Sequence, residues 1–355
     1  MFHGFGTTVP QHHFPKHLLF QWHITERCNL RCAHCYQESH TKQELDFDQL
    51  LFILDQYRSF LNEPVKHGLP PMTGHITITG GEPFIRNYFK DLLKIFASHH
   101  KQFSFAVLTN GTLIDLETAI HLKKLKPRFV QVSLEGPKET HDRIREIGNF
   151  EKTLTAIKNL VRCRIRVMIS FTAHQMNYRG FPEVAAISRK LKVYRVWADR
   201  LIPQGRGRGY EDLVLSPEQT LEFFNIMKQS RNKIHRTRFY NWFSRTEIAM
   251  HRALQFLVSG DHPYHCTAGD TLITVQPNGD LLPCRRMPIK VGNLLETPLV
   301  ELYQTSALFQ KLRNPECMDE ICKSCRYGHV CRGGLRCLSY AVSGDPFGCD
   351  PGCFI

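Results

Sequence analysis

The chain has 355 residues, of which 42% are hydrophobic and 22% are charged. This composition is ordinary for a globular protein and excludes collagen, coiled coil or disorder for the chain as a whole. The formal net charge of +13 favours an anionic partner, such as an acidic peptide, a phosphate-bearing cofactor or nucleic acid, without choosing among them.

Two kinds of membrane-directed segment are missing from the sequence. No apolar run approaches the roughly 20 residues that a membrane span needs. Residues 1–14 lack a basic stretch followed by an apolar core, so we expect no signal peptide. We therefore expect a cytoplasmic protein without a membrane partner.

Short β-like runs alternate with longer helical stretches over the first 200 residues or so. In the stretches 47–61 and 87–100, apolar residues recur every three or four positions, as in amphipathic helices. Strands that alternate with helices indicate right-handed βαβ units and a parallel sheet, open or closed as a barrel. The predicted strands are 18–25, 76–80, 103–110, 129–136, 164–173 and 194–203.

The chain changes character twice after these strands. Ser216 and Pro217 are typical of a helix start, and we predict a basic helical bridge over 216–260. Residues 271–284 predict a hairpin with its turn at Asn278 and Gly279. The predicted domains are an α/β core over 15–215, the bridge over 216–260, and a cysteine-rich unit over 261–355.

The turns that follow the predicted strands are rich in Gly, Asn and Pro. They read TGGEP, TNGT, SLEGP and PQGRGRG. Because ligands of parallel α/β proteins bind at the carboxyl ends of strands, we expect the chemistry in these turns. The last turn, 203–209, lies either beside a ligand or at the surface as a mobile basic loop, and the sequence slightly favours the second.

The 13 cysteines are distributed unevenly. Cys28, Cys32 and Cys35 form one group, Cys163 stands alone as an expected core residue, and nine others lie between Cys266 and Cys353. In a reducing compartment, clustered cysteines are more often metal ligands or redox groups than disulfides. We expect metal sites in both regions.

Three thiolates within eight residues can hold one cofactor, and the spacing alone allows two. A zinc site would need a fourth ligand, which His34 or His23 could supply. A [4Fe–4S] cluster would keep one iron without a protein ligand, free for another molecule.

The first half of the chain resembles the radical S-adenosylmethionine (radical SAM) superfamily. The resemblance rests on Cys28-x3-Cys32-x2-Cys35 directly after the first strand and on the GGEP motif at 80–83 after the second. It covers roughly residues 18–205 and implies a partial (β/α)6 barrel that resembles a TIM barrel. It also implies a [4Fe–4S] cluster on the three cysteines, reductive cleavage of SAM, and reduced flavodoxin or ferredoxin as electron donor.

The same resemblance implies a set of SAM-binding residues. His34 occupies the position that packs near the adenine, and the loop with Gly80, Gly81 and Glu82 holds the amino group. Ser133 and Arg145 match the positions that contact the ribose and the carboxylate. The neighbouring acids Glu135 and Asp142 have no assigned role, and the sequence identifies no catalytic acid or base.

The tail resembles a SPASM domain, a carrier of auxiliary [4Fe–4S] clusters. The resemblance implies that Cys266, Cys284 and Cys337 bind a first auxiliary cluster. Five residues, rather than the usual three, separate Cys331 from Cys337. A pair of zinc ribbons is the alternative. A second auxiliary cluster would be bound by Cys322, Cys325, Cys331 and Cys353.

Two cysteines of the tail remain surplus to this pattern, namely Cys317 and Cys349. The first auxiliary cluster also lacks a fourth ligand. Either surplus cysteine, His262 or His265 could complete it, or the position could be open to substrate.

The resemblance implies an enzyme, for which we weigh three substrate classes. The sequence-based hypothesis is a peptide maturase, which modifies a ribosomally synthesised peptide with an acidic leader by a crosslink, a thioether or epimerisation. The alternative substrate is the side chain of a tetrapyrrole. The third, formylglycine formation in sulfatases, is disfavoured because Arg285 stands where that family has an Asp. A non-catalytic iron–sulfur protein would not need the GGEP and SLEGP loops, and the sequence has no recognisable nucleic-acid-binding module.

Overall fold

A parallel sheet forms from the six apolar runs in the first part of the chain. The computed structural model describes residues 12–37, 43–232 and 246–355. Each strand of the sheet pairs in parallel with the next one along the chain. The strands are β1 (His17–His23), β2 (Thr73–Thr79), β3 (Phe103–Thr109), β4 (Val130–Ser133), β5 (Val167–Ala173) and β6 (Arg195–Arg200).

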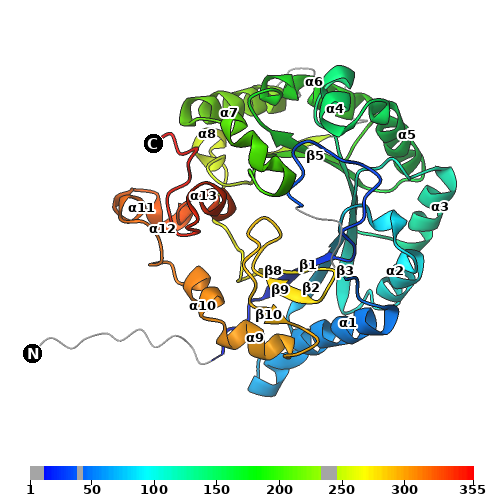
Figure 1. The fold of residues 1–355 in the computed structure, drawn as a ribbon, viewed down its shortest axis with the longest axis vertical. Coiled ribbons are helices and arrows are strands. Elements are labelled where there is room, and N and C mark those ends of the chain that lie inside the picture. Colours follow the sequence, from blue (N-terminus) through cyan, green and yellow to red (C-terminus); the bar gives the residue numbers. More distant parts are fainter. Residues whose placement is uncertain (1–11, 38–42, 233–245) are drawn as a thin grey trace, which may run out of the picture.

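Helices cover the outer face of this curved sheet (Figure 1). Phe20 and Trp22 of β1 are buried, and their rings contact Tyr57 and Phe96 of the helices outside. The helices are α1 (Phe47–Asn62), α2 (Phe89–Ser98), α3 (Leu116–Leu125), α4 (Lys138–Arg145), α5 (Asn149–Arg162), α6 (Phe181–Lys190) and α7 (Pro217–Asn232). Short 3-10 helices are η1 (Glu63–His67), η2 (Pro83–Ile85), η3 (Tyr178–Gly180) and η4 (Gly205–Leu213).

The rest of the chain extends the sheet at both edges. β7 (Glu247–Ala249) pairs in parallel with β6, and β8 (Leu272–Val275) pairs in parallel with β1. β9 (Asp280–Leu282) and β10 (Gly292–Asn293) continue the sheet in antiparallel fashion. The order of the ten strands is β10-β9-β8-β1-β2-β3-β4-β5-β6-β7.

The tail lies along the side where the barrel strands do not close on themselves (Figure 1). It occupies the gap between the edge near α1 and the edge near α7 and α8. α8 (Phe256–Ser259) precedes the tail, whose own helices are α9 (Leu299–Thr305), α10 (Ala307–Arg313), α11 (Glu320–Ser324), α12 (Gly328–Cys331) and α13 (Arg336–Ser343).

The structure confirms the predicted fold class, a partial (β/α)6 barrel with a cysteine-rich tail. The hairpin with Gly279 in its turn and the helix start at Ser216 are also present, and Ser216 Oγ accepts from Gln219 N at 3.2 Å. The expected helical bridge over 216–260 needs correction. It contains α7 but also strand β7, because Ile248 and Ala249 are buried beside β6. Residues 233–245 of this bridge lie outside the described residues.

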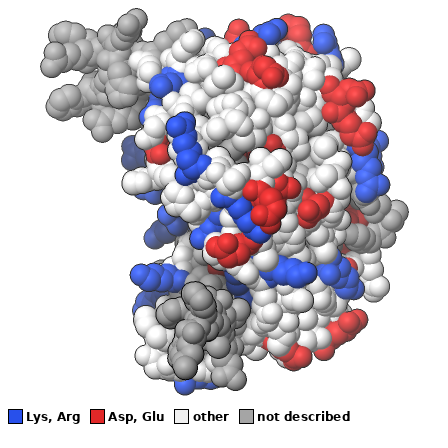
Figure 2. All heavy atoms as spheres, turned by 90° about the vertical axis from the view of Figure 1, so that its left-hand side faces the viewer, with Lys and Arg blue, Asp and Glu red and all other residues white. Residues whose placement is uncertain are grey.

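Two surface properties bear on possible partners, namely the apolar character of the helices and the distribution of charge. Among the described residues, no helix combines the length and apolar character required to cross a bilayer. Figure 2 shows the side on which the tail lies, where Lys and Arg stand among Asp and Glu. The net positive charge is therefore not gathered into one patch on that side.

Candidate active site

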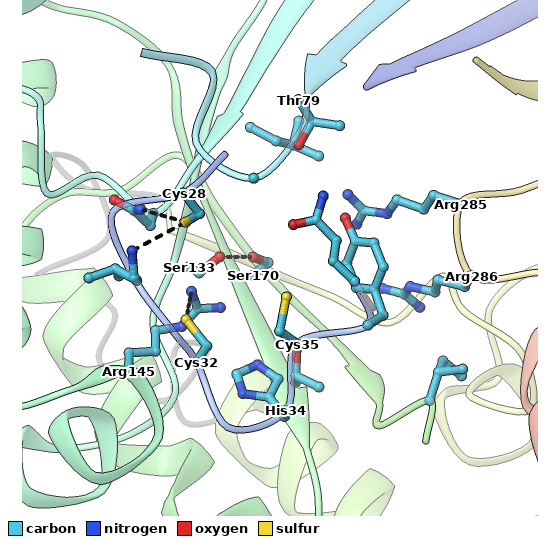
Figure 3. Close-up of a pocket in the computed structure, with 18 of the residues that line it drawn as sticks. Cys28, Cys32, His34, Cys35, Thr79, Ser133, Arg145, Ser170, Arg285 and Arg286 are labelled. Carbon is cyan, nitrogen blue, oxygen red and sulfur yellow. Dashed lines mark hydrogen bonds between the residues drawn. The ribbon is translucent and has the colours of Figure 1, made fainter. Parts of the chain in front are cut away.

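The loop after β1 brings three thiols to one cavity at the carboxyl ends of the strands. Cys28, Cys32 and Cys35 line this cavity, which we call the cluster cavity (Figure 3). The loop is tied to the end of α4, since Arg31 N donates to Glu146 Oε1 at 2.7 Å and Ala33 N donates to the Ile144 carbonyl at 2.9 Å. These hydrogen bonds fix the loop that carries the thiols against the end of α4.

Burial favours the neutral form of two of these thiols, Cys28 and Cys32. Burial raises the pKa of Cys32 to about 11, although the nearby Arg145 opposes the shift. Burial also raises the pKa of Cys28, whose Sγ accepts from Leu30 N at 3.4 Å. Because metals bind thiolates, metal binding here must release protons.

Two glycines of the GGEP loop allow close packing against the loop after β1. A Cβ on Gly81 would overlap the Arg27 carbonyl, and a Cβ on Gly80 would overlap the Thr25 carbonyl. Gly81 N donates to the Thr25 carbonyl at 2.8 Å. Both glycines line the cluster cavity, so their bare backbone faces the space in which a ligand would lie.

Glu82 lies differently from the other members of the predicted SAM site. Its carboxylate is buried and accepts hydrogen bonds from Thr109 Oγ1 at 2.8 Å and Asn110 N at 2.9 Å. The side chain is not part of the cavity lining and instead anchors the GGEP loop to the end of β3. Burial raises the pKa of Glu82 to about 7, against the effect of these hydrogen bonds.

The remaining predicted SAM ligands line the cluster cavity. Ser133, Arg145 and His34 all face it (Figure 3). Arg145 donates to Glu135 Oε1 from Nη2 at 2.6 Å and from Nε at 3.1 Å, and its Nη1 lies 3.6 Å from Cys32 Sγ. Although burial opposes it, Arg145 holds the pKa of Glu135 well below its usual range. Glu135 thus fixes Arg145 beside the thiols.

Two acidic residues with no predicted role prove to be structural. Glu135 also accepts from Thr172 N at 2.8 Å, which connects the SLEG turn to β5. Asp142 accepts from Gly148 N at 2.9 Å and from Phe150 N at 2.8 Å, so it caps the start of α5. Sequence alone gave no signal that separated these two roles.

The loop 203–209 packs against the cluster loop. Gly207 N donates to the Cys35 carbonyl at 3.1 Å, and a Cβ on Gly205 would overlap the backbone of Tyr36. Arg206 lines the cluster cavity. Of the two placements considered for this loop, the structure has the one beside the candidate ligand site.

A second cavity lies inside the barrel and shares a wall with the first. This lumen cavity has a volume of about 440 Å³ and extends to the starts of the strands, with His17, His75 and Arg128 in its lining. Leu108, Gln131 and Trp197 line both cavities, together with two arginines of the tail. The arginines of the lumen cavity are Arg128, Arg166, Arg195, Arg252, Arg285 and Arg286, and its carboxylate is Asp199.

The three cysteines expected in the first auxiliary group meet at one end of the lumen cavity. Cys266, Cys284 and Cys337 line it. Burial raises the pKa of Cys266 to about 11, and the nearby Cys284 thiolate raises it further. The considered fourth ligands Cys317, His262 and His265 do not line this cavity.

The second auxiliary group contains one more thiol than the predicted four. Cys349 Sγ lies 3.0 Å from Cys322 Sγ, so this surplus cysteine belongs to the second group and not to the first. Burial raises the pKa of Cys331 to about 11, and the thiolates of Cys353 and Cys325 add to the shift. Among the described residues, no three His, Cys, Asp or Glu side chains are gathered in a form that would hold a single metal ion.

Two consecutive residues of β6, Asp199 and Arg200, form ion pairs with the two auxiliary regions of the tail. Arg286 Nη1 donates to Asp199 Oδ2 at 2.7 Å, next to Cys284. Arg200 forms a bidentate pair with Asp350, with both N···O distances 2.6 Å and both side chains only 1% exposed. A Cβ on Gly352 would overlap the Arg200 guanidinium, so glycine is needed there. The sequence offered no signal for either pair.

Family comparisons agree with this arrangement. A model described as the radical SAM superfamily matches residues 22–185. A second model, described as an iron–sulfur cluster-binding domain of the SPASM type, matches residues 266–326. The matched segments contain the cluster loop, the GGEP loop and the first four cysteines of the SPASM pattern.

Curated relatives align with nearly the whole chain. An AdoMet-dependent heme synthase of Methanosarcina barkeri is 28% identical over 352 residues, which cover 94% of this chain and 95% of that protein. The mycofactocin maturase MftC of Mycobacterium tuberculosis is 28% identical over 345 residues, with 94% of this chain and 81% of that protein covered.

Among solved structures, the fold resembles that of anSMEcpe with bound AdoMet. The TM-score is 0.72 at 20% identity, and the match covers 95% of this chain and 94% of that chain. At this identity the likeness concerns the fold. Together with the cysteine loop, the GGEP loop and the two family models, it leads to one assignment: the chain is an enzyme of the radical SAM superfamily with a C-terminal SPASM domain.

Proposed function

We propose that this enzyme uses a SAM-derived radical to modify a tetrapyrrole whose side chains carry carboxylates. The observation that carries the proposal is the cationic lumen cavity, which adjoins the cluster cavity and shares five lining residues with it, namely Leu108, Gln131, Trp197, Arg285 and Arg286. A substrate bound in the lumen would face a radical generated beside Cys28, Cys32 and Cys35.

The donor set and shape of the cluster cavity fit the cofactors of the family. The three cysteines would hold a [4Fe–4S] cluster, and the bare backbone at Gly80 and Gly81 gives room for SAM. When bound, these groups supply a 5′-deoxyadenosyl radical that takes a hydrogen atom from an unactivated carbon. His34, Ser133 and Arg145 would orient SAM.

Two residues of the chain support that orientation indirectly. Glu135 holds the Arg145 guanidinium in one position through two hydrogen bonds. Glu82 fixes the GGEP loop against β3. We infer that Glu82 acts as an anchor of the loop, and that the backbone of the loop faces the amino group of SAM.

The lining of the lumen cavity suits a polyanionic substrate that also presents apolar surface. Six arginines and one carboxylate line it, so anionic groups inside would be attracted. Phe129, Trp197 and Met168 supply apolar surface between these charges. A tetrapyrrole combines an aromatic macrocycle with carboxylate side chains, and the heme synthase relative, which aligns over 94% of the chain, supports this class.

Peptide modification is the second candidate function. The mycofactocin maturase aligns over the same share of the chain at the same identity. An acidic peptide segment could also occupy a cationic cavity. We therefore keep a peptide substrate, with a crosslink, thioether or epimerisation as its product, as the outcome that would replace the first proposal.

Formylglycine formation is not proposed. Arg285 occupies the place at which an Asp base is expected in that family, and a guanidinium cannot accept a proton. The likeness to anSMEcpe at 20% identity is a likeness of fold.

The test compares substrates with the reconstituted enzyme under anaerobic conditions. Reduced flavodoxin supplies electrons, and formation of 5′-deoxyadenosine is measured with iron-coproporphyrin III or with a short peptide encoded beside the gene. We expect the tetrapyrrole to accelerate 5′-deoxyadenosine formation and to change in mass. Acceleration by the peptide alone would establish the second function. If neither accelerates it, both substrate assignments fail.

The number of clusters needs its own measurement. We propose two auxiliary [4Fe–4S] clusters, so about twelve irons per chain, falling to about eight when Cys28, Cys32 and Cys35 are all changed to Ala. About four irons with zinc present would instead make the tail a structural zinc unit.

A further inference from the structure

We propose that Arg285 binds a carboxylate of the substrate at the junction of the two cavities. The inference rests on the proposed function only in that the substrate carries carboxylates. It assigns a role in substrate recognition to a residue of the tail that the family resemblance leaves without one.

The position of Arg285 makes it accessible from both sides. It lines the cluster cavity and the lumen cavity, which few other residues do. Figure 3 shows Arg285 and Arg286 on the side of the cluster cavity opposite Cys28. A group bound to Arg285 would therefore lie between the SAM site and the interior of the barrel.

The two neighbouring arginines differ in their partners. Arg286 is engaged by Asp199, with an Nη1–Oδ2 distance of 2.7 Å. Within the described part of the chain, Arg285 has no carboxylate partner, and its guanidinium carbon lies 5.3 Å from the centroid of the Tyr36 ring.

A carboxylate is the ligand that suits this arrangement. The guanidinium is permanently charged and presents N–H donors that can bind both oxygens of one carboxylate. The guanidinium also lies over the Tyr36 ring, a cation–π contact that limits its motion and so lowers the entropic cost of binding. Arg252 repeats the pattern deeper in the lumen, 4.4 Å from the centroid of a Trp197 ring, so a substrate with several carboxylates could be held at two heights.

Equilibrium binding to the reconstituted enzyme tests the role of Arg285. The probes are benzene-1,3,5-tricarboxylate and iron-coproporphyrin III, with the tetramethyl ester of the latter as an uncharged control. We expect Arg285→Gln to weaken binding of both acids by about 10- to 100-fold, because a charge-assisted hydrogen bond is lost. Arg285→Lys should weaken it less, and the ester should not distinguish the proteins.

A matched variant and a second ligand keep the test specific. Lys290 lies on the same segment, is 56% exposed on its side chain and pairs with Asp280, and it lines neither cavity. Lys290→Gln should leave both affinities unchanged. The affinity for SAM should be unchanged in Arg285→Gln, and iron content and circular dichroism should match those of the wild type.

Each outcome separates this inference from the proposed function. If wild type binds the tricarboxylate through Arg285 but does not bind iron-coproporphyrin III, the tetrapyrrole assignment fails and the carboxylate site stands. If Arg285→Gln binds both acids as tightly as wild type, or loses affinity for SAM instead, the inference is overturned. Failure of the tricarboxylate to bind the wild type overturns it as well.

Discussion

The cluster loop and the second auxiliary group gather thiols in opposite ways. Cys28, Cys32 and Cys35 come from one short loop whose backbone is tied to α4. The second auxiliary group, which we call the rear group, takes its five cysteines from α11 and its C-cap, from α12 and from the turn near the end of the tail. The positions of the cluster-loop thiols, which we call the front site, therefore depend on one loop, whereas those of the rear group depend on the fold of the whole tail. Mutations should for this reason affect the two sites differently.

The largest expected effect comes from breaking the front site. Cys32→Ala should abolish reductive SAM cleavage, because two thiolates cannot hold the cluster that the family uses. The tail should keep its iron, since its ligands belong to other segments. Formation of 5′-deoxyadenosine and iron content measure the two effects. Loss of all iron in this variant would contradict the separation of the sites.

The rear site should depend on the buried pair between Arg200 and Asp350. Arg200→Met leaves a buried carboxylate without its partner, which should lower the free energy of unfolding by about 3 to 5 kcal/mol. Urea denaturation measures this change. Arg200→Met combined with Asp350→Leu should recover most of the loss, and Arg179→Met, in an exposed pair, serves as a control. Equal destabilisation by the single and double variants would exclude the ion pair as the cause.

The front loop should show a dependence on pH through Glu82. Its pKa is raised from 4.5 to about 7 in the folded state, so its stabilising contribution is complete below pH 4.5 and is lost as the pH rises through about 7. Between pH 5 and pH 8 the free energy of unfolding should fall by about 2 kcal/mol more in wild type than in Glu82→Gln. The exposed Glu139→Gln should behave as wild type. If the free energy of unfolding depends on pH equally in all three proteins, Glu82 is not the cause of the pH dependence.

The smallest expected effect sharpens the ligand assignment in the tail. Cys353→Ser should remove about four irons, whereas Cys349→Ser should remove none, because a [4Fe–4S] cluster takes four thiolates and the rear group has five. Iron analysis and electron paramagnetic resonance of the reduced protein distinguish the two. Cys163→Ser, a change at a residue packed against the core, is the control. The reverse pattern would make Cys349 the ligand.

Sequence reasoning succeeded where the signal is local. The alternation of strands and helices, the hairpin and the front cysteine loop depend on residues close together in the chain, and all are present. It failed at β7, because three residues are too few to show a strand period. The sequence also did not predict the buried position of Glu82, because its partners Thr109 and Asn110 lie at the end of the next strand.

Contacts between distant segments account for most of what the sequence did not predict. Asp199 and Arg286 are 87 positions apart, and Arg200 and Asp350 are 150 apart. Cys349 was surplus to the spacing pattern, and only the folded tail places it against Cys322. Motif spacing identified the ligand types, and the tertiary fold decides which of them meet.

The two charges of β6 set a condition for exchanging tails between enzymes of this kind. Neighbouring side chains of a strand point to opposite faces, so Asp199 and Arg200 grip the tail from two directions. A chimera joined after β6 would replace the tail that carries Arg286 and Asp350. Asp199 and Arg200 would then both be buried charges without a partner. Recombination should therefore succeed only when β6 and the tail are inherited as one block, although they are far apart in the gene.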